Sequence, residues 1–160
     1  MMAFMAANPE AFKELVLLAF FPKNPLAPRA AWLLSNCMEE KDPRVGMHAQ
    51  NIIDTLDEVA DGHKRDLINV LCQVDLDEEL EGVLFDRCIN IWCKLDGIPS
   101  VRATAFKLIL LVTRKYPDLY NEVVLLTQDP YLETLSPGIR RSIQKQIKSF
   151  EKSLDHQPRR

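Results

Sequence analysis

Residues 97–109, GIPSVRATAFKLI, place one arginine at the start of an otherwise almost wholly apolar helical segment, and an arginine opens a helical segment at three other places in the chain. The other three stretches are APRAAWLLSN (27–36), HKRDLINVLC (63–72) and GIRRSIQKQI (138–147). The four arginines are Arg29, Arg65, Arg102 and Arg140. Their separations are 36, 37 and 38 residues, and each follows a turn rich in proline or glycine. Self-similarity at a period of this length indicates stacked helical repeats.

A second set of amphipathic segments alternates with these four. We expect helices at about residues 9–21, from Pro43 onward, at about 76–95 and at about 117–128. In the segment after Pro43, apolar side chains recur at helical spacing: Val45, Ala49, Ile52, Ile53 and Leu56. Asp42 can cap this helix, and proline is tolerated at the first helical position. No segment alternates convincingly with a period of two, so we expect no sheet.

These segments together predict eight helices in four antiparallel pairs. One pair cannot cover its own apolar face, but stacking against the next pair can. The last helix carries one narrow apolar stripe, as expected of a terminal cap: Ile139, Ile143, Ile147, Phe150 and Leu154. The predicted fold is therefore all-α, a short right-handed α-solenoid. At 160 residues it fits one domain, 1–154. Its repeats are expected at about 9–40, 43–74, 76–116 and 117–154, followed by a flexible tail at 155–160.

The composition is that of a soluble globular protein, with 47% apolar and 27% charged residues and a net charge of −3. No apolar run approaches the length that spans a bilayer, and the start lacks the features of a secretory signal. The four cysteines form no CxxC pair and lie in apolar helical patterns, which suits reduced, buried thiols: Cys37, Cys72, Cys88 and Cys93. We therefore expect a cytoplasmic protein.

The turn motifs SVRATA and GIRRSI, in helix pairs of this period, resemble HEAT or armadillo-type repeats. The order PRAAWLLSN, DGHKRDLINVLC, LDEELEGVLFDRCINIW and YPDLYNEV is similar to a group of small HEAT-like proteins of Bacteroidetes-type bacteria. Some members of that group carry the name adenylosuccinate lyase. The present chain is too short for that enzyme and lacks its Gly- and Ser-rich signature loop. The resemblance implies an α-solenoid that presents a groove to a protein or peptide.

The arginine series has two interpretations. In HEAT-like repeats such an arginine commonly packs across the turn and donates to carbonyls or to a neighbouring carboxylate. Alternatively, the four guanidinium groups form a ladder offered to an acidic peptide or to phosphates.

Trp32 also has two interpretations. Arg29, Trp32, Asn36 and Glu39 fall on the helix face opposite Ala30, Leu33, Leu34 and Cys37. A tryptophan one turn after an arginine is a plausible hot spot for binding a partner. Large aromatic side chains are also common contacts between helices, in which case Trp32 is buried between repeats.

Trp92 and Asp96 raise an enzymatic alternative. HEAT-like DNA glycosylases that remove alkylated bases use a tryptophan and an aspartate one helical turn apart, with an arginine from a neighbouring repeat. Trp92 and Asp96 have that spacing, and Arg102 or Arg140 is then the arginine. The alternative requires an exposed Trp92 and a continuous basic surface, whereas Trp92 shares an apolar stripe with Phe85 and Ile89.

Charge is concentrated at the end of the chain. Residues 137–160 contain seven Lys or Arg and two acids, so they carry +5 while the rest carries −8. This segment is either a solvated cap or a site for an acidic partner. The acidic stretch VDLDEELEG lacks calcium-loop spacing, the three histidines do not cluster, and no nucleotide-binding glycine loop is present.

We therefore expect a non-catalytic protein-interaction module that uses no metal or cofactor. The predicted contact surface lies on the second helix of each pair, with Arg29, Trp32, Asn36, Arg65 and Arg102 as its residues. The expected partner is an unidentified protein or peptide, not nucleic acid or a membrane, and the chain is expected to be a monomer or weak dimer.

Overall fold

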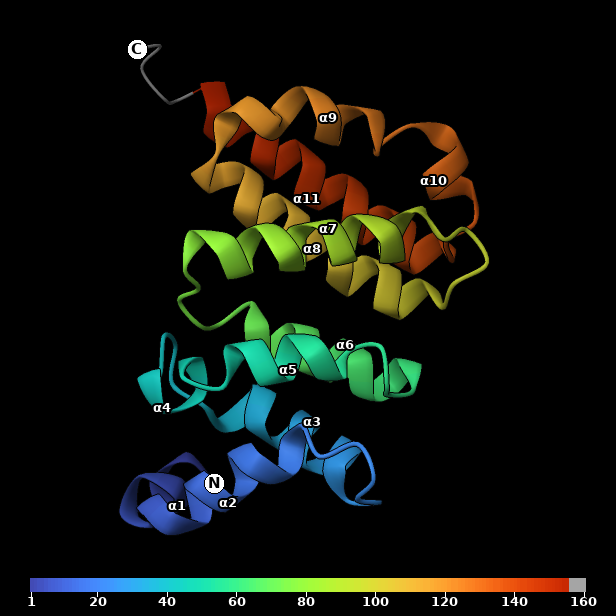
Figure 1. The fold of residues 1–160 in the computed structure, drawn as a ribbon. Coiled ribbons are helices and arrows are strands. Elements are labelled where there is room, and N and C mark those ends of the chain that lie inside the picture. The colour runs from blue at the N-terminus through green and yellow to red at the C-terminus, as the bar shows by residue number, and fades with distance from the viewer. Residues whose placement is uncertain (156–160) are drawn as a thin grey trace. The chain divides into compact units, whose positions relative to one another are not determined.

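The structure is a computed structural model that describes residues 1–155. Throughout those residues the chain forms α-helices and one 3₁₀ helix, with no strand, which confirms the all-α prediction (Figure 1). In chain order the elements are α1 (Met2–Ala7), α2 (Pro9–Ala19), α3 (Ala27–Cys37), α4 (Pro43–Gly46), α5 (Ala49–Thr55), α6 (Asp61–Leu71), α7 (Glu78–Cys93), α8 (Pro99–Lys115), η1 (Pro117–Leu119), α9 (Tyr120–Leu125), α10 (Asp129–Glu133) and α11 (Pro137–Asp155).

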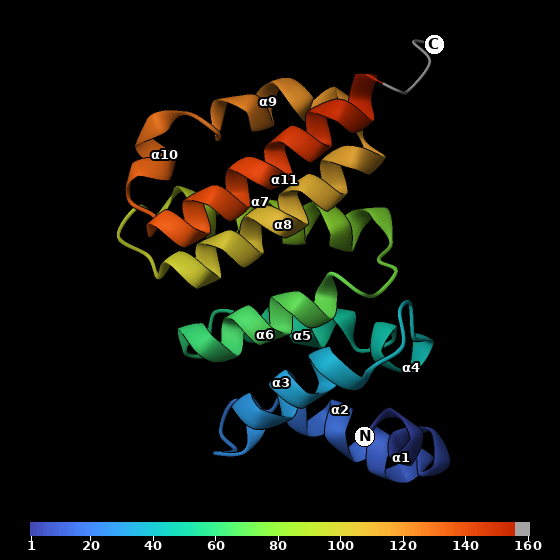
Figure 2. The same ribbon diagram turned by 180° about the vertical axis from the view of Figure 1, so that it is seen from behind.

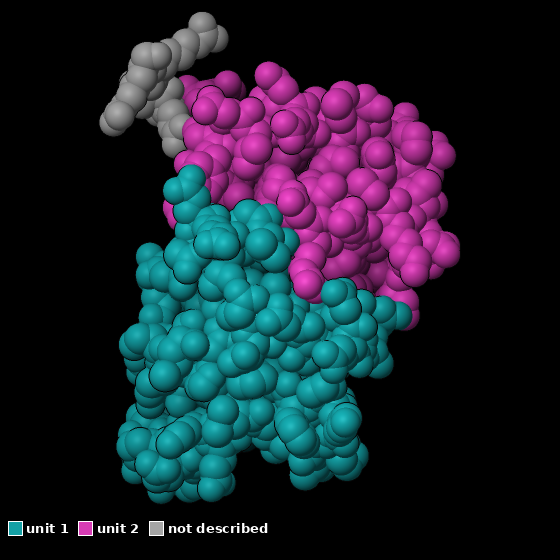
Figure 3. Space-filling model, viewed as in Figure 1, with its two compact units in different colours: residues 1–84 teal, residues 85–160 magenta. Residues whose placement is uncertain are grey.

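The chain divides into two compact units, Met1–Leu84 and Phe85–Arg160, and the boundary falls inside α7 (Figure 3). Each unit has its own hydrophobic core. The large fully buried side chains of unit 1 are Phe12, Leu34, Ile52, Ile53, Leu56, Leu67, Ile68 and Leu71. Those of unit 2 include Trp92, Phe106 and Phe150.

Unit 1 is built from helix hairpins whose second members, α3 and α6, pack against each other. α2 packs on α3 and α5 packs on α6, so apolar stripes on four helices close one core. Proline occupies the first turn of α2, α3 and α4, where its missing N–H costs no intrahelical hydrogen bond. The short helix α1, which the sequence patterns did not predict, lies against α2 and buries none of its side chains.

The helix expected from Pro43 is interrupted, so the prediction of one continuous helix is wrong. Asp42 caps it as expected, because its Oδ1 accepts from the Arg44 N–H at 2.9 Å. The break follows Gly46, where the His48 N–H donates to the Val45 carbonyl, three residues back, at 2.9 Å. This tight turn separates α4 from α5. The predicted apolar stripe from Val45 to Leu56 is nevertheless buried throughout.

Unit 2 has two helical layers. Figures 1 and 2 show α7, α9 and α10 in one layer and α8 and α11 in the other. α8 packs on α11, and ring contacts join the layers: Trp92 of α7 meets Phe106 of α8 with ring centroids 4.4 Å apart. Tyr120 of α9 meets Phe150 of α11 at 5.9 Å.

Three predicted helix bounds in the chain need correction. The single helix expected at about 117–128 is η1 followed by α9, and a separate helix, α10, begins at Asp129 with Pro130 in its first turn. Proline is accepted there because a first-turn N–H has no intrahelical partner. α3 ends at Cys37, before the expected end of the first repeat at about residue 40. α7 ends at Cys93, so Leu95 lies beyond it and is exposed. Of the predicted tail, Asp155 ends α11 and residues 156–160 lie outside the described residues.

Candidate functional site

The arginine series divides into internal and surface members. Arg102 has 0% exposure. Its Nε donates to the Trp92 carbonyl at 2.9 Å, Nη2 to the Tyr131 carbonyl at 3.0 Å and Nη1 to the Thr134 hydroxyl at 2.7 Å. The prediction that Arg102 contacts a partner is therefore wrong, because its guanidinium is committed inside unit 2.

The acceptors of Arg102 explain why an arginine stands at the start of a second helix. Trp92 and Tyr131 lie in the last turns of α7 and α10, where carbonyl oxygens have no N–H donor within the helix. Arg140 does the same, donating to the carbonyls of Leu132 and Glu133 at 3.0 and 2.8 Å. A cation there also complements the helix dipole. For Arg102 and Arg140 the structural interpretation is confirmed: both cap a preceding helix.

The two arginines of unit 1 are placed differently. Arg65 is half-buried and pairs with the adjacent Asp66, with Nη2 to Oδ1 at 3.1 Å. The end of α2, the helix that precedes Arg29, is capped instead from α6: the buried His63 has its Nε2 2.6 Å from the carbonyl of Ala19. Sequence reasoning missed His63, although its position two residues before Arg65 was the available signal. Arg29 is exposed, and within residues 1–155 it has no hydrogen-bond or ion-pair partner.

Trp32 lies on the exposed side of α3, with 55% of its surface accessible. The opposite side of the helix supplies Ala30, Ala31, Leu34 and Cys37 to the core. The interpretation of Trp32 as a buried contact between repeats is therefore wrong. Arg29, Trp32 and Asn36 are all exposed and follow one another at i, i+3 and i+7, so they share one helix face.

The backbone around Trp32 is held by local hydrogen bonds. Its carbonyl accepts from the Ser35 hydroxyl at 2.8 Å and from the Asn36 Nδ2 at 2.7 Å. The Ser35 carbonyl in turn accepts from the Gln73 side chain at 2.9 Å, which ties the end of α6 to the end of α3. These bonds use the amide nitrogen of Asn36 and leave its Oδ1 as an acceptor toward solvent.

Trp92 is placed in the core of unit 2, where it has 0% exposure. Its ring stacks with Tyr131 at 6.4 Å and lies under the Arg102 guanidinium at 4.9 Å, and its Nε1 donates to the Leu126 carbonyl at 2.9 Å. Asp96 is exposed in the turn after α7. A buried tryptophan cannot hold a flipped-out base, so the arrangement on which the DNA glycosylase alternative depended is absent from the described residues.

Groups for covalent or metal chemistry are not assembled in the described part of the chain. No three His, Cys, Asp or Glu side chains come together there to hold a metal ion. None of the four cysteines, all within the described residues, forms a disulfide, and burial raises the pKa of the Cys37 thiol. A raised pKa keeps the thiol protonated and makes it a poor nucleophile.

Among the surface hollows of the described residues, three larger ones lie within single units. An apolar groove of about 320 Å³ runs between α2 and α4, with Leu17 and Met47 on its rim. A hollow of about 250 Å³ lies beside the Pro22–Pro25 turn. The third, of about 510 Å³, lies along α11 in unit 2. Sequence reasoning did not predict the first two, because each is formed by two segments that are far apart in the sequence.

Hairpins of amphipathic helices, with arginines capping the ends of preceding helices, define a helical-repeat protein. The family model of the HEAT repeat domain matches residues 1–150, and the chain belongs to that family. The expected fold class is thereby confirmed. No curated protein and no solved structure matches the chain. HEAT repeats commonly act as scaffolds for protein interactions. In residues 1–155, no helix is long and apolar enough to cross a membrane.

Proposed function

We propose that this protein is a non-catalytic scaffold that binds a protein or peptide through the exposed face of α3. The Trp32 surface, defined as Arg29, Trp32 and Asn36, is the centre of the contact, and Arg65 of the neighbouring helix α6 extends it. Arg102 has no part in it, because it is buried. The single observation that carries the proposal is the 55% exposure of Trp32 on a second helix of a HEAT repeat protein.

An exposed tryptophan side chain leaves a large apolar surface in water. A large aromatic side chain on a surface gains free energy when a partner covers it, and tryptophan is enriched among residues that dominate binding. Trp32 stands on a helix that is fixed by its core contacts and by the Gln73 bond to α6. Little entropy is therefore lost when a partner orders it, which favours affinity.

The polar groups beside Trp32 define the chemistry of the partner. The Arg29 guanidinium, exposed and without a described partner, can form a two-pronged hydrogen-bonded pair with a carboxylate. The Oδ1 of Asn36 can accept from a backbone N–H. The surface thus suits a segment that carries an apolar side chain for Trp32 and an acidic residue near it. Four points remain predictions: the partner as a protein or peptide, the cytoplasmic location of the chain, its monomeric or weakly dimeric state, and its resemblance to Bacteroidetes proteins.

The test compares Trp32→Ala with a matched change at Leu125, which is 59% exposed in unit 2. Each variant, with wild type, is used to capture proteins from a native lysate at physiological salt. A partner bound by wild type and by Leu125→Ala but lost with Trp32→Ala supports the proposal. Equal capture by all three refutes it.

Fluorescence provides an independent reading with the purified partner. Trp32 is accessible to acrylamide and Trp92 is not, so quenching of the free protein reports Trp32. A partner that covers Trp32 shifts the emission to shorter wavelength and protects it from the quencher. A bound partner that leaves quenching unchanged contacts some other surface.

A further inference from the structure

Charge is separated between the two layers of unit 2. Helix α8 carries four cations and no acid: Arg102, Lys107, Arg114 and Lys115. Helix α11, in the same layer, carries five cations and two acids. In the opposite layer, residues 117–133, which form η1, α9 and α10, contain four acids and no lysine or arginine: Asp118, Glu122, Asp129 and Glu133. An ordinary solvated surface mixes charges of both signs, so this separation needs an explanation.

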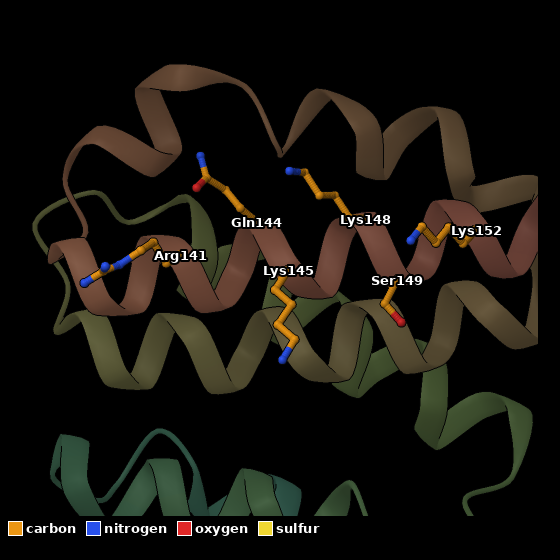
Figure 4. A pocket seen from close by; sticks show the side chains of 6 residues that line it. All are labelled: Arg141, Gln144, Lys145, Lys148, Ser149 and Lys152. Atoms are coloured by element: carbon orange, nitrogen blue, oxygen red, sulfur yellow. The ribbon is translucent and has the colours of Figure 1, made fainter.

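The cations of α11 form a row. Arg141, Lys145, Lys148 and Lys152 are spaced i, i+4, i+7 and i+11, so they share one side of the helix, and all four are exposed. Ile143 and Phe150, which are buried, lie on the opposite side. The row lines the hollow of about 510 Å³ together with Gln144 and Ser149. In Figure 4 the side chains of this face fan out along α11, with Lys145 and Ser149 extending below the helix in that view and Gln144 and Lys148 above it.

The two central cations of the row are not neutralised within residues 1–155. Arg141 uses its Nε for the Pro137 carbonyl at 3.3 Å. Lys145 and Lys148, at the centre of the row, have no carboxylate partner among residues 1–155. Their positive potential is therefore available to an external anion.

We propose that this cationic row binds an acidic helical segment of a partner protein. The row runs from Arg141 to Lys152, eleven helical rises or about 16 Å. Carboxylates at i, i+4, i+7 and i+11 of a second helix repeat at the same distances, so each can face one cation. Charge complementarity of this kind gives specificity and fast association. The site is separate from the Trp32 surface and does not depend on it.

The composition of the face favours a protein over a nucleic acid. Proteins that bind single strands stack bases on exposed aromatic side chains, but the aromatics of α8 and α11, Phe106 and Phe150, are buried. Duplex DNA is a long polyanion, and the net charge of −3 and the acidic opposite layer repel it. A short acidic segment contacts only the row and avoids most of that repulsion.

The experiment uses two fluorescently labelled synthetic helices of about 18 residues, a length at which an alanine-based peptide is helical. One carries glutamates at i, i+4, i+7 and i+11, and the other carries glutamines at the same positions. Anisotropy is measured as the full-length chain is added, at about 20 mM and about 150 mM salt. The glutamate peptide is expected to bind, more weakly at the higher salt, and the glutamine peptide is not.

Variants separate the row from the net charge. The double reversal Lys145→Glu with Lys148→Glu is expected to weaken binding about tenfold or more, because two attractions become repulsions. The control reverses Lys23 and Lys94, which are exposed and lie outside the row, and it is expected to bind as wild type does. Trp32→Ala is also expected to bind normally, so failure of the proposed function does not affect this result. Thermal unfolding checks that each variant is folded.

Four outcomes would overturn the proposal. In the first, the control reversal weakens binding as much as the Lys145/Lys148 reversal does. In the second, the glutamine peptide binds as tightly as the glutamate peptide. In the third, duplex DNA binds more tightly than the glutamate peptide. The fourth is salt-sensitive self-association in sedimentation that the Lys145/Lys148 reversal abolishes, which would assign the row to a second copy of the chain.

Discussion

Replacing Arg102 by alanine is expected to destabilise unit 2 far more than replacing Arg29, although the two arginines occupy equivalent positions in their repeats. Arg102 donates three hydrogen bonds from a fully buried guanidinium, whereas Arg29 is exposed. Burial lowers the pKa of Arg102, yet no carboxylate compensates it. The helix-end carbonyl oxygens of Trp92 and Tyr131 therefore stabilise the buried charge in place of water.

The magnitude follows from opposing contributions. Three hydrogen bonds from a charged donor, at about 1.5 to 3 kcal/mol each, amount to about 5 to 9 kcal/mol. Arg102→Ala also removes the desolvation cost of the buried guanidinium, which is on the order of several kcal/mol. The difference leaves an expected loss of about 3 to 4 kcal/mol in the free energy of unfolding for Arg102→Ala. For Arg29→Ala the expected change is within about 0.5 kcal/mol, as for other exposed positions.

The assay is urea unfolding followed by tryptophan fluorescence in a Trp32→Phe background, so that Trp92 alone reports unit 2. Arg102→Met is the second variant, because methionine keeps part of the side-chain volume while removing all three donors. Arg102→Met is expected to recover only the part of the lost unfolding free energy that comes from the cavity left by alanine. A loss below about 1 kcal/mol for Arg102→Ala, or an equal loss for Arg29→Ala, would refute the capping explanation.

Three further predictions concern other contacts. Hydrogen bonds from Arg44 hold the pKa of the Asp42 carboxyl below its usual range in the folded protein. Asp42 therefore stabilises the fold at pH values above its unfolded-state pKa of about 4. This contribution is lost as the pH falls from there through the lower folded-state pKa. Asp42→Asn is therefore expected to lower stability at pH 7, and its deficit in urea titrations is expected to shrink as the pH falls below the unfolded-state pKa. Lys41 has a positive φ of 61°, a conformation that costs free energy for a residue with a Cβ but not for glycine. Lys41→Gly is therefore expected to raise the unfolding free energy by between zero and about 1 kcal/mol. A clear loss of stability in a urea titration would contradict this explanation. Trp92→Phe leaves the Leu126 carbonyl without its donor and is expected to lower the free energy of unfolding by about 2 to 3 kcal/mol. The tryptophan emission of this variant comes from Trp32 alone and should be fully quenched by acrylamide.

Much of the fold followed from patterns within short segments. The stripe from Val45 to Leu56 is buried and Asp42 caps its helix, because side-chain spacing and capping depend on neighbours along the chain. The interruptions after Gly46 and before Asp129 were not predicted. A tight turn changes the spacing of apolar residues too little to alter a stripe, so periodicity alone does not show where a helix is broken.

The candidate site was only partly predictable. The faces of α3 and α11 follow from residue spacing, and the structure places Trp32 and the row from Arg141 to Lys152 in solvent. The same spacing made Arg29 and Arg102 look equivalent, but one is exposed and the other is buried. The difference arises because α7 and α10 present their carbonyl ends to Arg102, while His63 caps α2 in unit 1.

The sequence by itself determined the repeat period, the all-helical class and which residues share a helix face, because these are properties of contiguous residues. Tertiary structure alone decided which arginines are caps, that Trp92 is buried and that Trp32 is not. Those outcomes depend on which helix ends and rings meet across segments about 30 residues apart, as with Trp92 and Leu126 or Arg102 and Tyr131. A guanidinium or an indole can satisfy its donors in water or inside the protein, and only the neighbours brought by folding decide between the two.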